Sequence, residues 1–284
     1  MQILSIKNAD YSYNYTTFGI NLQSKKLQFK EDDFYVMIRG YGRNSEWARK
    51  IKETADNAVF FIRKKLDFET TLKNITQGVT EANQYPLDLE KRQHTGILRV
   101  AREGWKHGSN WKHSDSFLIT GYGSNKNNKY KIYMDRFDYT IKKPLQNPYN
   151  DICLTRPIYD KDTFGKFLNH PHAKFIPSAF EHLKTIYNKL YTKYIINEPK
   201  KDNLNNINAL IAEMRWILAH STPWERGSDA ISNTFIRSIY KAMGIKAYPL
   251  KKGVSLDLEA YCTNLDDYKK KFANYFIKKP EIID

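Results

Sequence analysis

The sequence predicts an α+β protein in which a mainly antiparallel sheet packs on helices and is followed by a C-terminal helical layer. Short segments with alternating apolar residues, separated by turns, fill residues 2–40 and 94–142, which is typical of antiparallel strands. Apolar residues recur at three- and four-residue steps in 45–65 and 68–83, and again within 178–276, which indicates helices. Strands and helices thus occur in blocks, whereas a parallel doubly wound sheet requires strict alternation.

The N-terminal region is expected to form strands and then two helices. Tyrosines alternate between residues 11 and 15, and residues 34–39 read as a strong buried strand that ends at a glycine turn. A helix is predicted over 45–65, with Ser45 as its N-cap, and a second over 68–83.

Strands are predicted again at 97–100, 116–120 and 130–134. The triplet Trp-Lys-His occurs at 105–107 and at 111–113, where tryptophans beside basic residues suit an exposed loop on which bases can stack. Two histidines without a third ligand make a poor metal site, so no metal centre is predicted.

Prolines punctuate residues 143–177, which therefore read as an irregular crossover. The chain divides accordingly into an α+β region (1–150), a crossover (151–177) and a helical region (178–284), or forms one domain that contains all three. A helix is predicted from Ser178 to about Ile196.

Residues 203–244 predict a helix, a short turn and a second helix, and the chain is organised around them. Pro223 ends the first helix, because proline disfavours helical geometry in the residue before it, and Gly244 suits a left-handed C-cap. One apolar stripe follows the first helix: Leu204, Ile207, Leu210, Ile211, Met214, Ile217 and Leu218.

The turn at 220–229 concentrates reactive and anion-binding groups. His220 is the candidate general base, with Glu225 to orient it, and Asp257 is a further candidate catalytic carboxylate. An anion is expected to bind the helix N-terminus and a neighbouring arginine. The candidate anion-binding residues are Trp224, Arg226, Gly227, Ser228 and Asp229.

We expect His220, Arg226 and Ser228 to line one solvent-reachable pocket, with Asp257 or Glu259 on its rim. The same side chains also fit a purely structural role, in which serine and aspartate cap the second helix and the histidine caps the first.

The turn resembles the core of the Fic (fido-fold) transferases, whose loop runs His-Pro-Phe, two residues, then Gly-Asn-Gly-Arg. His220 matches the loop histidine, Pro223-Trp224 resembles Pro-Phe after a two-residue insertion, and Gly227-Ser228 resembles Gly-Asn. The second glycine and the following arginine are replaced by Asp229-Ala230. The resemblance implies that His220 deprotonates a target hydroxyl and that Gly227-Ser228 holds a nucleotide diphosphate.

Composition favours partners that carry phosphate. Lysine and arginine total 46 against 31 acidic residues, a formal net charge of +15, which suits nucleic acid, nucleotides or acidic lipid. The lysines are scattered, so weak, salt-sensitive nucleic-acid binding is expected at most. No apolar run approaches the roughly 20 residues that span a bilayer, and the N-terminus lacks the layout of a secretory signal.

Two classes of function follow. The first is a transferase or hydrolase that acts on a phosphate-containing substrate, including a bacterial virulence effector that modifies a host protein. The second is a non-enzymatic basic module that binds nucleic acid, acidic lipid or a protein. The sequence identifies no cofactor, since Walker, zinc-helix and kinase signatures are missing. We expect the protein in the cytoplasm or, as an effector, inside a host cell.

Overall fold

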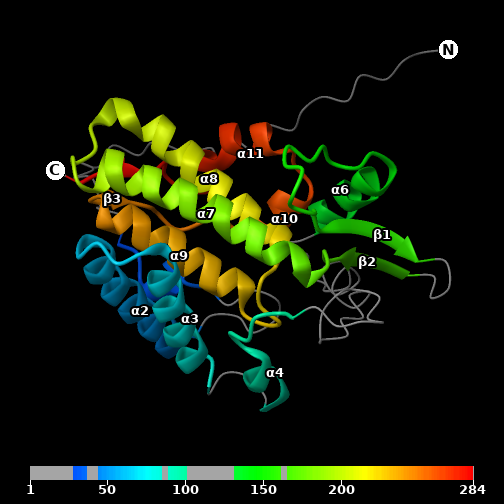
Figure 1. The fold of residues 1–284 in the computed structure, drawn as a ribbon, viewed down its shortest axis with the longest axis horizontal. Coiled ribbons are helices and arrows are strands. Elements are labelled where there is room, and N and C mark those ends of the chain that lie inside the picture. The colour runs from blue at the N-terminus through cyan, green and yellow to red at the C-terminus, as the bar shows by residue number, and fades with distance from the viewer. Residues whose placement is uncertain (1–27, 37–43, 85–88, 101–130, 161–164, 284) are drawn as a thin grey trace, which may run out of the picture.

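The computed structural model describes residues 28–36, 44–84, 89–100, 131–160 and 165–283 (Figure 1). Helices predominate in this part of the chain, and its strands form two small antiparallel sheets. The α+β class is therefore confirmed, whereas a sheet-dominated architecture is not.

The centre of the fold is α8 (Leu204–Ser221), which other helices surround. It packs against α7 (Ile176–Leu190), α9 (Ser228–Ala242), α10 (Leu256–Tyr261) and α11 (Leu265–Lys271). Its buried residues are found on every side of the helix, which is typical of a helix enclosed by protein. They include Ile207, Ile211, Met214, Trp216, Ile217 and Leu218, none of which is exposed.

A pair of helices, α2 (Ser45–Arg63) and α3 (Phe68–Ala82), forms a layer against α9 (Figure 1). Both helices were predicted. The Asn44 side chain, and not Ser45, caps α2 by accepting a hydrogen bond from Trp47 N at 2.8 Å. Asp67 caps α3 in the same way through Thr70 N at 2.7 Å.

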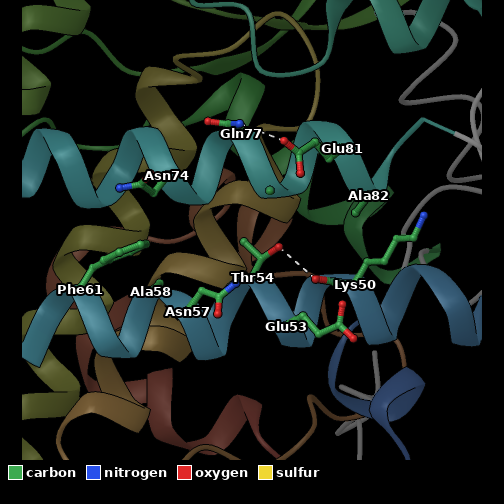
Figure 2. A pocket seen from close by; sticks show the side chains of 11 residues that line it. Lys50, Glu53, Thr54, Asn57, Ala58, Phe61, Asn74, Gln77, Glu81 and Ala82 are labelled. Atoms are coloured by element: carbon green, nitrogen blue, oxygen red, sulfur yellow. Dashed lines mark hydrogen bonds between the residues drawn. The ribbon is translucent and has the colours of Figure 1, made fainter.

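A polar groove of 440 Å³ runs between α2 and α3, and Figure 2 shows the side chains that line it. The two helices approach closely at Gly78, because a Cβ atom there would lie 2.5 Å from the Thr54 side chain. A larger residue at this crossing would displace the Thr54 side chain, so glycine is favoured here although it weakens an isolated helix.

The N-terminal and middle segments contain further short elements. Helix α1 (Glu31–Phe34) packs on α2, and α4 (Leu89–His94) leads into an extended segment. Helix α6 (Lys131–Lys142) packs against a hairpin of β1 (Arg156–Asp160) and β2 (Gly165–Asn169), in which Arg156 pairs with Asn169.

The remaining elements complete the C-terminal half. The 3₁₀ turn Ala173–Phe175 precedes α7, the π-helical turn Tyr191–Ile195 extends it, and Lys201–Asn203 precedes α8. The 3₁₀ turn Phe272–Tyr275 follows α11. Strands β3 (Ile245–Lys246) and β4 (Glu281–Ile282) pair antiparallel.

Three of the predicted strands are wrong where the structure describes them. Residues 131–134 belong to α6, because Tyr133 and Phe137 continue a helical spacing and are buried together. Residues 34–36 form the end of α1 and an irregular segment, with Val36 38% exposed. Residues 97–100 contain one isolated bridge, at Leu98, and no regular strand. The other strands expected before residue 28 and at 116–120, and the Trp-Lys-His triplets, lie outside the described residues.

Candidate functional site

The turn between α8 and α9 is fixed by the extended segment that follows α4. Two short bridges join them, at Thr95 with Arg226 and at Leu98 with Trp224. The backbone hydrogen bonds are Glu225 N to Ile97 O (2.9 Å), Arg99 N to Pro223 O (2.9 Å), Arg226 N to His94 O (3.1 Å) and Gly96 N to Arg226 O (3.1 Å). The turn is therefore a paired, rigid structure.

Arg99 caps the C-terminal end of α8 from this segment. Its guanidinium donates to Thr222 O at 2.6 Å, Ser221 O at 2.7 Å and Pro171 O at 2.9 Å. Burial lowers the pKa of Arg99 to about 10, so the side chain stays charged at neutral pH. A cation at this position also complements the helix dipole.

His220 lies inside the protein. The side chain is fully buried between Trp216 and Tyr261, with ring-centroid distances of 4.1 and 5.6 Å. Its Nε2 donates to Ala260 O at 3.1 Å, so Nδ1 carries the lone pair, and Nδ1 has no hydrogen-bond partner among the described residues. Burial lowers the pKa of His220 to about 3, which keeps the ring neutral. A solvent-reachable general base at His220 is therefore inconsistent with the structure.

Glu225 orients a different histidine. Its Oε2 lies 2.5 Å from Nδ1 of His94, while its Oε1 is buried without a hydrogen-bond partner in the described chain. The Glu225 side chain is 1% exposed and the His94 side chain is 27% exposed. A buried carboxylate that holds the Nδ1–H of a partly exposed imidazole is a recurring arrangement for proton transfer.

The expected anion-binding residues are used largely to close the turn. Trp224 is 2% exposed and packs on Phe180, so it belongs to the core. Ser228 Oγ donates to Trp224 O at 3.0 Å. Gly227 precedes α9 with φ of +84°, a conformation that favours glycine. Arg226 is half-buried.

Two further predicted residues lie around a buried arginine in α8. Asp229 forms an ion pair with Arg215 and accepts from Asn233 Nδ2 at 3.0 Å. Burial acts to lower the pKa of Arg215, but the carboxylates of Asp229 and Asp257 raise it on balance. Asp257 itself is 4% exposed and accepts from Leu258 N at 2.8 Å.

The predicted residues thus separate into three groups and do not line one pocket. His220 contacts the backbone of α10, Glu225 pairs with His94, and Asp229 pairs with Arg215. Glu259 does not reach this turn, because its Oε1 accepts from Tyr133 Oη at 2.7 Å and from Arg136 at 2.9 Å.

The sequence interpretation overlooked His94, Arg99 and Arg215. Arg215 offered a signal, since it stands in a largely apolar helix between Met214 and Trp216, where a charge must be paired. His94 and Arg99 offered none, because His94 lies 131 residues from Glu225 and Arg99 lies 72 to 123 residues from the carbonyl groups that it binds.

The chain belongs to the AvrB_AvrC family of avirulence proteins, whose pattern matches residues 103–279 and thus the whole of α8, the turn and α9. It is similar to avirulence protein B of Pseudomonas savastanoi pv. glycinea, with 30% identity over 105 residues. That alignment covers 37% of this chain and 30% of the relative.

The family match contradicts one interpretation of the sequence and agrees with another. The resemblance to Fic transferases is wrong, because the family match that spans the turn is to avirulence proteins. The expected virulence-effector character agrees with the family. Among the described helices, none is long and apolar enough to cross a membrane.

Proposed function

We propose that this protein is a bacterial effector that is delivered into a host cell and acts there by binding a host protein. The observation that carries the proposal is the avirulence-family match, which spans α6 to α11 and includes the turn. The similarity to avirulence protein B supports it. The alignment covers less than a third of that relative. The partner and the activity of this chain are therefore proposals for this chain and are not taken from the relative.

The proposal can be tested in two stages. A reporter enzyme that is active only inside host cells, fused to the chain, should give signal when the bacterium contacts the host. A secretion-deficient strain is the control. The purified chain should then bind one host protein, and the complex of these two proteins should be stable enough to isolate. The absence of reporter signal from the host cells, or of a binary complex, would contradict the proposal.

The finer proposal is that the effector is a transferase or hydrolase acting on a phosphate-containing group, with proton transfer at His94. The support is geometric, since Glu225 holds the His94 imidazole and Arg226 N donates to the backbone carbonyl of His94. Gly227, which precedes α9, lies against the side chain of Thr95, the residue after His94. Arginine and helix N–H groups are suited to phosphate. His220 has no part in this mechanism, because it is buried.

Two matched substitutions separate this chemistry from stability. His94→Gln retains a donor towards Glu225 but removes the base. The effect of the delivered protein on the host cell, here called the host response, should therefore disappear, while the melting temperature of the protein changes little. His220→Gln should lower the melting temperature and preserve the response in proportion to the folded protein. The reverse pattern would exclude His94 as the base.

A further inference from the structure

The last part of the chain forms a two-stranded ribbon at the end of the molecule remote from α6 (Figure 1). We call residues 244–252 and 275–283 the C-terminal ribbon. Strands β3 and β4 form its centre, and hydrogen bonds extend it on both sides. They run from Lys251 N to Tyr275 O (2.9 Å), Ile277 N to Pro249 O (2.8 Å) and Ile283 N to Gly244 O (3.0 Å).

The C-terminal ribbon is strongly basic. Its two segments contain a single carboxylate, Glu281, which bonds to Lys278 at 2.6 Å and to the Tyr248 hydroxyl. Five lysines of the ribbon are exposed: Lys246, Lys251, Lys252, Lys278 and Lys279. Rigid backbone pairing thus concentrates positive charge that is otherwise scattered along the sequence.

Large aliphatic side chains of the ribbon, and of one segment beside it, are also exposed. Ile277 is 47% exposed and Ile283 is 61% exposed. Ile196, from the segment after the π-helical turn, is 58% exposed and lines the same groove as Ile283. Lysine beside exposed isoleucine is the combination by which peripheral proteins bind an anionic bilayer, with charge attracting headgroups and aliphatic groups entering the interface.

We propose that the C-terminal ribbon is a docking surface for an anionic lipid membrane. The lysines lie against acidic headgroups, and Ile277 and Ile283 insert at the boundary of the acyl chains. This surface does not include the α8–α9 turn, so the inference goes beyond the effector function and is tested separately from it.

The chemistry of the ribbon favours lipid over single-stranded nucleic acid. Sequence-tolerant nucleic-acid binding uses exposed aromatic rings on which bases stack. The aromatic residues of the ribbon are instead buried, since Tyr248 and Tyr275 are 8% exposed and Phe276 is 2% exposed. The ribbon also contains no arginine for bidentate phosphate contacts.

The test is co-sedimentation of the full chain with phosphatidylcholine vesicles that contain or lack phosphatidylserine. Binding is expected only with phosphatidylserine, and it should weaken as salt screens the lysines. The substitutions Lys251→Gln, Lys252→Gln and Lys279→Gln together should weaken partitioning by roughly a hundredfold, since each lysine near such a surface contributes roughly fivefold. Ile277→Ser should weaken it by roughly tenfold, through the lost apolar contact.

A variant with equal charge provides the control. Lys73 is exposed on α3, Lys142 is exposed at the end of α6 and Lys143 directly follows it. None of the three belongs to the ribbon, so their replacement by glutamine should change partitioning much less. Three results would each overturn the proposal: no binding to phosphatidylserine vesicles, equal loss in the control variant, or tighter binding to an oligonucleotide that the ribbon substitutions abolish. Melting curves of every variant verify that the fold is retained.

Discussion

Acidification should destabilise this protein through His220. The folded protein holds the pKa of His220 at about 3 because the ring is buried, whereas an unfolded histidine titrates near 6.5. Below pH 6.5 the unfolded chain therefore binds a proton that the folded protein excludes. Stability is complete above pH 6.5 and declines as pH falls towards 3. Between pH 7 and pH 5 the loss is about 2 kcal/mol, at about 1.4 kcal/mol per pH unit below 6.5.

The assay is denaturant unfolding of the wild type and His220→Gln at pH 7, 6 and 5. Glutamine can still donate to Ala260 O but does not titrate, so other ionisable groups cancel in the comparison. The wild type should lose about 2 kcal/mol more than the variant between pH 7 and pH 5. His182→Gln is the control, because His182 is partly exposed and pairs with Asp151. Parallel pH profiles for wild type and His220→Gln would refute the assigned burial.

Three further substitutions test the packing. Arg99→Ala should cost about 3 kcal/mol or more in unfolding free energy, since it leaves three carbonyl groups without their charged donor; Arg99→Lys should recover only part of it. Gly78→Ala should lower the melting temperature through its contact with Thr54, and adding Thr54→Ala should restore much of the loss. Arg215→Leu should cost about 3–5 kcal/mol because Asp229 loses its partner, and a double-mutant cycle with Asp229→Asn should show coupling.

Several elements could be predicted from the sequence because their signals are local. The helices at 45–63 and 68–82 follow apolar spacing that a helix of 3.6 residues per turn places on one side. The helix at 204–221 was predicted from the same spacing, although the structure buries it on every side. Gly244 adopts a φ of +69°, as expected of a residue that ends a helix. The strand predicted at 130–134 is wrong over residues 131–134, because strand alternation and helical spacing cannot be told apart over so few residues. Burial of Tyr133 beside Phe137 selected the helix.

By itself, the sequence determined the central helix–turn–helix, the net charge of +15 and the concentration of polar groups at the turn. Tertiary structure alone decided what each group does there. It buried His220 against α10, and it brought His94 to Glu225 across 131 positions of sequence. It also paired two distant lysine-rich segments into one ribbon. The physical reason is that burial and electrostatic pairing depend on which distant segment completes each contact. Local periodicity specifies the face of a helix and leaves its partner undefined.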